Sequence, residues 1–490
     1  MALVTAEHNG ITSSDSQIRY QRHSTSDSQD FASAENSNGA LNGHVDRNRS
    51  HDRHDSSNSA VRVEIADLDE RTYTTTGALR RCQQIVMQPY SALLTLVGWR
   101  SIGKDFVYPS TVLLRTCNIF YTMLVIGLQL YTFVYQVVAC EGKLDINTDT
   151  QDPSTTAMPV SNVTTAWGPL WAPIGPAAHR RQCYHITTTY IVPAILHFAI
   201  YFTGFVHFRL QENEQLYILM EKVYLQNIPF SRNAMQATVT FNARCFLYMG
   251  ILWSCLGVFV QGTSALAFGV TPSILFRVTW ATYVLFALQL VGFLLCYLVW
   301  ASVIVNYTTH CELLIAYING IHVRLREKSI ELRIAMHEIL GSRESLSMLN
   351  GTIARMTGIG VLSNGELTIV GICLLVLNDA RSPWVWVYRS IFPVTFGLAL
   401  LFPLIQAARV SKTAEKLKQI CFEMRVFGYK DSNQLELDSF LLFVNHASLR
   451  AKLFGVPINP ALVMSLVAGV ALTLLILFQM GVISGANIMF

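Results

Sequence analysis

The chain has 490 residues, of which 51% are hydrophobic and only 14% are charged. Soluble domains carry about 25% charged residues, so this composition excludes an ordinary soluble protein and indicates a polytopic membrane protein. The formal net charge of +4 is small. It favours a charge bias among cytoplasmic loops over a nucleic-acid partner.

Residues 1–78 are predicted to form a disordered cytoplasmic tail. They are rich in Ser, Asp, Asn, His and Gly, and so little apolar surface does not offset the entropy of ordering the chain. His44, His51 and His54 cluster in this tail. We interpret them as solvated side chains and expect neither a metal nor a cofactor. Residues 79–111 are predicted to form a juxtamembrane segment with short helices.

Residues 112–490 are predicted to form an all-α domain with seven transmembrane helices. Roughly 20 apolar residues cross the hydrocarbon core of a bilayer. A helix is the open-chain structure that satisfies its own backbone there. Seven stretches meet this length, at about 112–139, 186–208, 245–268, 278–305, 359–377, 387–408 and 458–485.

The distribution of Lys and Arg predicts the orientation of these helices. About 20 of them lie before the first segment and in the connections on the same side, against 6 in the opposite connections. Because cytoplasmic loops carry the excess of basic residues, the N-terminus is predicted to be cytoplasmic and the C-terminus extracellular.

The first outer loop is predicted to be glycosylated and contains two cysteines. Asn162 begins an Asn-Val-Thr sequon. Cys140 and Cys183 bracket the same loop, and a bridge between them would contribute about 4 kcal/mol by loop entropy. The sequence leaves both the bridged and the free state open.

The inner loops 306–358 and 409–457 carry apolar residues near helical spacing among charged ones. This pattern favours membrane helices that extend into the cytoplasm and pack there as an anchor. The alternative is a set of helices that lie on the membrane surface.

The chain lacks the sequence motifs of several functional classes. The chain contains no Walker loop, no His-Glu-x-x-His and no Gly-x-Ser-x-Gly, so we expect no enzyme. A G-protein-coupled receptor would place its N-terminus outside, and here Asn459-Pro460 is not followed by a tyrosine at Val463. A non-channel transporter is a further alternative, although acidic residues are almost absent from the apolar segments.

The inner N-terminus, the seven segments and the last helix resemble the insect gustatory receptor family. The family signature is Thr-Tyr, five apolar residues, then Gln-Phe. Here Leu472-Thr473 precede five apolar residues and Gln479-Met480 follow, so the apolar run and the Gln match. The stretch from Phe454 to Asn459 is also similar to the family's approach to this helix. The polar tail and the degenerate motif look most like the carbon dioxide receptor subunits, with a sugar or bitter receptor as the alternative.

This resemblance implies a ligand-gated cation channel in the plasma membrane of sensory neurons, with the dendrite as its expected site. It implies a homo- or hetero-tetramer of related subunits, with the last helix lining the pore. Leu472, Ile476, Gln479 and Ile483 share one helix face, and Met480 follows the Gln of the motif. Four such faces would form a hydrophobic gate beside an amide ring. Alternatively, Gln479 bonds a neighbouring helix.

The resemblance also implies a small-molecule pocket in the outer half of each subunit, for carbon dioxide, bicarbonate or another tastant. Aromatic walls with a few polar groups suit such a site, although aromatic residues near an interface are also common membrane anchors. Arg277 and Arg389 near the outer ends would favour an anion. The candidate ligand-binding residues are Tyr190, His197, Gln261, Trp280, Tyr283, Tyr388 and Phe392.

Overall fold

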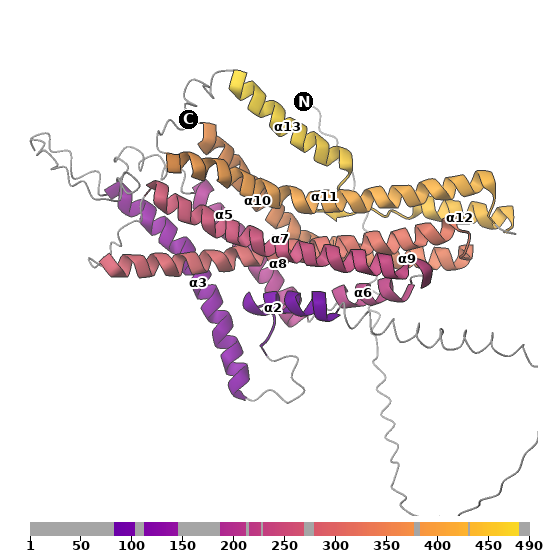
Figure 1. Cartoon of the computed structure of the whole chain (residues 1–490), viewed down its shortest axis with the longest axis horizontal. Helices are drawn as coiled ribbons and strands as arrows, with labels where there is room; N and C mark the ends of the chain where they lie inside the picture. Colours follow the sequence, from indigo (N-terminus) through magenta and orange to yellow (C-terminus); the bar gives the residue numbers. More distant parts are fainter. Residues whose placement is uncertain are drawn as a thin grey trace, which may run out of the picture. The chain divides into compact units, whose positions relative to one another are not determined.

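The computed structural model describes residues 83–102, 112–145, 187–211, 215–226, 229–268, 279–376, 383–429 and 432–479. These residues form an almost entirely helical bundle with one two-stranded hairpin (Figure 1). The predicted tail 1–78 lies outside this range, as does the outer loop 146–186.

The elements follow in chain order, with π-helical turns denoted η. They are η1 (Gln83–Met87), α2 (Gln88–Leu96), α3 (Val112–Asp145), η3 (Thr187–Ile191), α5 (Val192–Phe205), η4 (Val206–Leu210), α6 (Gln215–Gln226), α7 (Pro229–Phe268), α8 (Thr279–Arg326), α9 (Leu332–Met348), η5 (Leu349–Ile353), α10 (Ala354–Val376), α11 (Pro383–Phe427), α12 (Gln434–His446), β1 (Lys452–Leu453), β2 (Val456–Pro457) and α13 (Pro460–Gln479).

Helices α8 and α11 form the centre of the described bundle. Helix α8 packs against α3, α6, α7, α10 and α11, and α11 also packs against α7 and α10. Leu314, Ile318 and Ile321 of α8 have no exposed surface, because neighbouring helices cover α8 on several sides. A helix that is apolar on all sides needs such cover or lipid around it.

Five described helical stretches are long and apolar enough to cross a membrane. They are Val112–Val137, Ala237–Ala265, Tyr283–Arg326, Leu332–Leu375 and Pro383–Phe427. Helix α8 has 48 residues and α11 has 45. At about 1.5 Å per residue each is roughly twice the thickness of the hydrocarbon core, so both extend well beyond it.

The two remaining predicted segments are helical but shorter. The second is α5, with 14 residues between π-helical turns at both ends. The last is represented by the apolar stretch Pro460–Ile476 of α13. The described chain is thus an all-α membrane fold. The region predicted as the loop 306–358 is largely helical, because α8 continues to Arg326 and α9 follows it.

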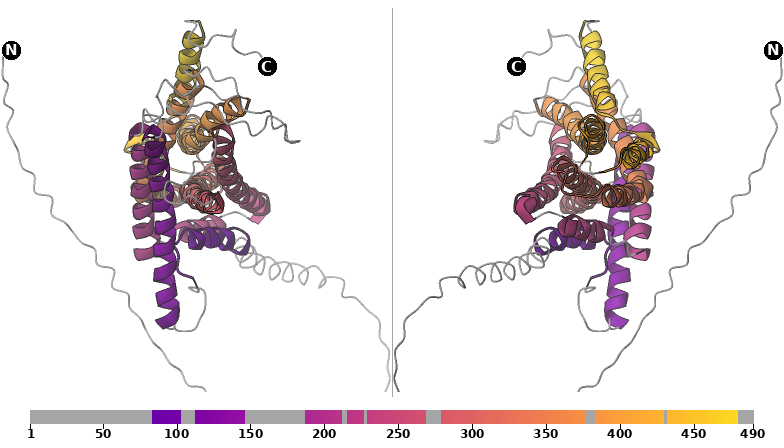
Figure 2. Two further views of the ribbon diagram at one scale, coloured as in Figure 1. Left: turned by 90° about the vertical axis from the view of Figure 1, so that its left-hand side faces the viewer. Right: turned by 90° about the vertical axis from the view of Figure 1, so that its right-hand side faces the viewer.

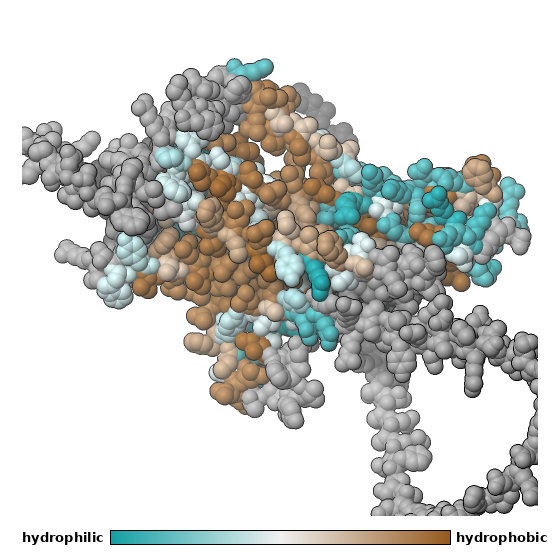
Figure 3. All heavy atoms as spheres, in the orientation of Figure 1, coloured by the Kyte–Doolittle hydropathy of each residue, from teal (hydrophilic) through white to brown (hydrophobic). Residues whose placement is uncertain are grey.

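The surface changes character along the helices. Hydrophobic residues gather around α5, α10 and α13, whereas hydrophilic residues predominate around α12 and the adjoining end of α11 (Figure 3). The hydrophilic part, which we call the anchor, comprises the end of α8, α9, the end of α11 and α12. Its place at the ends of membrane-length helices fits the predicted cytoplasmic extension.

The short helix α2 is bound to the bundle by Trp99, which follows it and has no exposed surface. The indole ring stacks on Phe208 with centroids 5.4 Å apart. A Cβ at Gly204 would lie 2.4 Å from the same indole, so only glycine permits this close approach. Arg209 donates to the Gly98 carbonyl over 3.0 Å, which ties the residues after α2 to the inner end of η4.

Candidate ligand site and gate

A cluster of aromatic rings fills the space between α7, α8 and α11. Trp253 and Trp300 stack with centroids 6.2 Å apart, and Tyr297 meets the Trp253 ring edge-on at 5.5 Å. Phe396 lies 6.1 Å from Trp300 and 4.7 Å from Phe392. The Trp253 indole donates to the Thr395 carbonyl over 2.9 Å. The rings therefore form one aromatic wall that three helices share.

His197 extends this cluster toward α3. It is fully buried, and its Nε2 lies 3.3 Å from Oε1 of Gln129, which is also buried. The ring is 5.9 Å from Trp300 and 5.5 Å from Phe133. A polar pair thus lies among apolar rings, an arrangement that suits a small, weakly polar ligand. Gln129 is not among the residues predicted from the sequence, although an amide in an apolar segment is a detectable signal.

Tyr388 and Phe392 of α11 belong to the same cluster, and both are buried. Their rings lie 5.6 Å apart. Tyr388 is close enough to Tyr190 and Tyr297 for electrostatic interaction. Gln261 donates to the Tyr297 hydroxyl over 3.2 Å. The structure therefore brings five of the seven candidate ligand residues together: Tyr190, His197, Gln261, Tyr388 and Phe392.

Trp280 and Tyr283 are not brought to this cluster. Each is 67% exposed near the start of α8. Exposed aromatic rings at the end of a membrane helix are typical of interface anchors, which is the alternative that the sequence left open. Arg389 is almost fully buried, and its guanidinium carbon lies 6.0 Å from the Trp386 ring, while Arg277 lies outside the described residues.

The candidate gate helix α13 projects from the other helices and packs mainly against α11 (Figures 1 and 2). Leu472, Ile476 and Gln479 are all exposed, as are most other side chains along the helix. Met480 and Ile483 fall beyond the described residues. A helix with so little cover in its own chain leaves its apolar faces for lipid or for other copies.

The segment that precedes α13 is bound to the start of α10. Asn350 donates through Nδ2 to the Arg450 carbonyl over 3.1 Å, and its Oδ1 accepts from the Lys452 amide over 2.8 Å. Asn350 lies in η5, where Gly351 has non-helical backbone angles and separates α9 from α10. We call this pair of hydrogen bonds the Asn350 clamp.

Two further contacts attach the hairpin and the start of α13. Phe454 lies at the hairpin turn with a φ of 50°, followed by Gly455 with a φ of 79°. A Cβ on Gly358 of α10 would lie 2.5 Å from the Phe454 ring. Ser411 of α11 donates to the Ile458 carbonyl over 2.8 Å. Movement of α10 or α11 would therefore reach the base of α13 directly.

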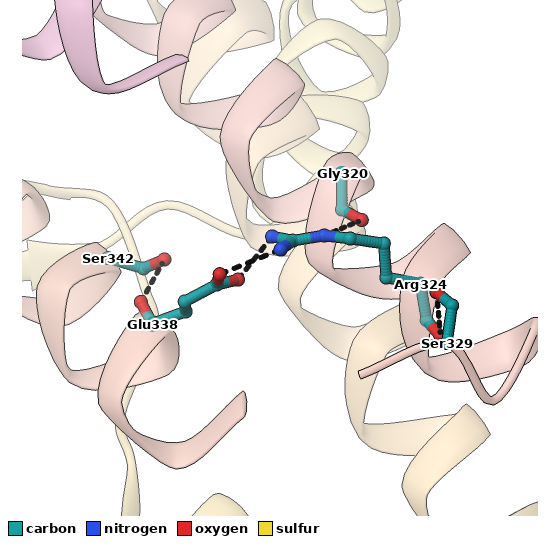
Figure 4. A network of polar contacts seen from close by, with 5 residues as sticks. All are labelled: Gly320, Arg324, Ser329, Glu338 and Ser342. Atoms are coloured by element: carbon teal, nitrogen blue, oxygen red, sulfur yellow. Dashed lines mark hydrogen bonds and ion pairs between the residues drawn. The ribbon is translucent and has the colours of Figure 1, made fainter. Parts of the chain in front are cut away.

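The anchor contains an ion pair with little exposure between α8 and α9. Arg324 holds the Glu338 carboxylate with two guanidinium nitrogens, one of them over 2.7 Å (Figure 4). The side chains are only 14% and 10% exposed. Bidentate Arg–carboxylate geometry is among the strongest polar contacts in proteins. It therefore fixes α9 against the end of α8.

A second polar network joins three helices where the bundle meets the anchor. Glu312 of α8 is buried; it accepts from Asn242 of α7 over 2.7 Å and from Arg409 of α11 over 3.0 Å. Arg409 also donates to Gln406 over 2.8 Å. Since a buried carboxylate needs partners of this kind, the network ties α7, α8 and α11 together.

The predicted glycosylation site and disulfide are not described by the structure. Asn162 and Cys183 lie outside the described residues, and the side chain of Cys140 is not described although its backbone belongs to α3. Glycosylation and the bridge therefore stay predictions. Within the described ranges, no group of three or more metal-ligating side chains occurs.

Comparison with known proteins shows a similarity of fold. No protein-family model matches the chain, and no curated protein matches it. The structure of the insect olfactory receptor OR5 from Machilis hrabei in complex with eugenol has a TM-score of 0.56 and 12% identity, over 82% of this chain and 99% of that chain. Another structure of the same receptor has a TM-score of 0.54 and 12% identity, over 80% and 97%. This chain therefore shares the helical membrane fold of these insect olfactory receptor structures.

Proposed function

We propose that the chain is a subunit of a ligand-gated cation channel that serves chemosensation, with carbon dioxide sensing as its specific role. The observation that carries the proposal is α13, an apolar helix that its own chain leaves largely exposed. Gln479, with its side-chain amide, is the last residue of α13. Several such helices around an axis would form a pore with a hydrophobic constriction and an amide ring.

Exposed apolar side chains in the anchor support assembly with like subunits. Phe422, Val426 and Phe427 of α11, and Leu435 and Leu442 of α12, are exposed on helix ends that extend beyond the hydrocarbon core. Lipid tails do not cover this part, and large apolar side chains exposed to water on two helices favour a protein partner there. The family resemblance implies that the assembly is a tetramer, with identical or related partners.

The aromatic cluster supports a small ligand as the stimulus. It combines apolar rings with the Gln129–His197 pair and the Gln261–Tyr297 hydrogen bond. Carbon dioxide offers weak acceptors and a quadrupole, which match aromatic edges and single donors. We propose that this cluster, including Tyr190, Tyr388 and Phe392, forms the ligand site, at the plasma membrane of a sensory neuron.

The test is electrical recording from cells that express the full chain with candidate partner subunits, under carbon dioxide and sugars. We expect carbon dioxide to evoke a cation current. Gln479→Leu is expected to change ion permeability ratios, because it removes the amide ring. Thr473→Val is the matched control, since the Thr473 hydroxyl donates to the Gly469 carbonyl of its own helix over 2.9 Å.

Three results would contradict the proposal. One is solute uptake without ligand-gated current, which would favour a transporter. Another is antibody access to the N-terminus on intact cells, which would favour a G-protein-coupled receptor. The third is a Gln479→Leu channel with unchanged permeability, which would remove α13 from the pore.

A further inference from the structure

A small cavity lies inside the bundle where α5, α8, α10 and α11 meet. Its volume is about 10 Å³, and its lining includes Trp300 of α8, Gly360 and Asn364 of α10, and Ala399 and Pro403 of α11. A volume of this size holds about one water molecule. The cavity borders the aromatic cluster, because Trp300 belongs to both.

Two of the lining side chains have a buried polar atom without a hydrogen-bond partner. Nε1 of Trp300 is a donor, and Oδ1 of Asn364 is an acceptor. Both residues are more than nine-tenths buried. The amide nitrogen of Asn364 donates to the Gly360 carbonyl over 2.7 Å, which leaves the oxygen as the atom that still needs a partner.

The backbone of α11 supplies another acceptor at the same place. Pro403 lies inside α11, and a proline has no N–H to donate to the carbonyl four residues earlier. That carbonyl belongs to Ala399, which also lines the cavity. In membrane helices, ordered water is one of the groups that satisfy carbonyls freed in this way.

We propose that this cavity binds one water molecule, which accepts a hydrogen bond from Trp300 Nε1 and donates to Asn364 Oδ1 and to the Ala399 carbonyl. Three hydrogen bonds are typical of a buried water. The water joins α8, α10 and α11 beside the aromatic cluster. It is therefore an exchangeable polar link among the helices that connect this cluster to the base of α13.

Gly360→Ala tests the site with little disturbance. A Cβ at Gly360 would have its nearest neighbour, Ile200 Cδ1, at 3.8 Å, which is an ordinary contact. Because Gly360 and Ile200 both line the cavity, we expect the added methyl group to occupy part of it. Gly365→Ala is the matched control on the same helix. Its nearest neighbour is Leu400 Cδ1 at 3.9 Å, and Gly365 is not among the lining residues.

The experiment is cryo-electron microscopy of the full-length assembly at a resolution that shows buried waters elsewhere. We expect one density peak about 3 Å from the three polar atoms in the natural protein and in Gly365→Ala, and loss of that peak in Gly360→Ala. A map of the natural protein without the peak, or with elongated density from a larger molecule, would overturn the proposal.

A second measurement uses thermal unfolding of the purified assembly. Trp300→Phe and Asn364→Leu each remove one hydrogen-bond partner of the water. The drop in melting temperature of the double variant should therefore be smaller than the sum of the drops of the two single variants. The described structure has no direct hydrogen bond between these side chains. Losses that add fully would contradict a shared water.

Discussion

Glu338→Gln is expected to weaken the anchor strongly. The substitution keeps the shape of the side chain but removes its charge, so Arg324 is left with an incomplete partner at 14% exposure. Breaking a buried ion pair by altering one partner costs about 3–5 kcal/mol. Because the pair is partly exposed and the amide can still accept one hydrogen bond, the expected cost is about 1.5–3 kcal/mol, the value for a hydrogen bond to a charged group.

The assay is the midpoint of thermal unfolding of the detergent-purified full-length protein, followed by size-exclusion chromatography. We expect a drop of several degrees and loss of the proposed oligomer from the chromatogram, because α9 would no longer be fixed to α8. Glu436→Gln is the matched control: its ion pair with Arg333 spans 3.6 Å with side chains 38% and 84% exposed, and such pairs contribute about 0–1 kcal/mol.

Equal unfolding midpoints for the two variants would contradict a buried, strongly stabilising Arg324–Glu338 pair. Equal values would mean that the Arg324–Glu338 pair is as well solvated in the assembled protein as the pair on the surface. A Glu338→Gln protein with a normal midpoint but no oligomer would instead separate assembly from the stability of the subunit.

Three further variants test other contacts. Gly292→Ala should reduce surface expression severely, because its Cβ would lie 1.9 Å from a threonine hydroxyl and 2.7 Å from a backbone carbonyl of α3; Gly127→Ala, with nothing within 4 Å, should be expressed normally. In the proposed channel, Asn350→Ala should raise the ligand concentration for half-maximal current by about five- to thirtyfold, since it removes two exposed hydrogen bonds that contribute roughly 0.5–1 kcal/mol each. Asn350→Asp should have an intermediate effect in the same recordings. Gln129→Leu should cost about 1–3 kcal/mol in thermal unfolding, because it leaves His197 Nε2 buried without its partner. An Asn350→Ala channel with an unchanged dose response would exclude the clamp from gating, and an unchanged midpoint for Gln129→Leu would show that the imidazole finds another partner.

The local pattern of apolar and charged residues was sufficient to predict most of the helices. The length and apolarity of the segments at about 112–139, 278–305 and 387–408 predicted α3, α8 and α11, since a membrane requires such runs whatever surrounds them. The apolar spacing in 306–358 and 409–457 predicted the helical anchor. Boundaries were less accurate, because α7 begins at Pro229, 16 residues before the predicted start at Cys245, in a polar stretch where apolar length carries no signal.

Residue types allowed only part of the candidate ligand site to be predicted. Tyr388, Phe392 and His197 were found because aromatic and polar residues are conspicuous in an apolar segment. Trp253, Tyr297 and Trp300 were missed, since an aromatic residue in a membrane helix faces lipid, core or ligand with the same sequence signal. The Asn350 clamp was also missed, because its partners lie about 100 residues away along the chain.

Residue order was sufficient to predict a helical membrane protein with a charged inner end and an uncharged final helix, since hydrophobic length and charge bias act locally. The contacts between distant side chains came only from the folded chain: the three-helix aromatic cluster, the buried Arg324–Glu338 pair and the cavity at Pro403. Those sites depend on the angles and positions at which the long helices cross one another. Crossing is set by the packing of many side chains from distant segments, which no single stretch of sequence contains.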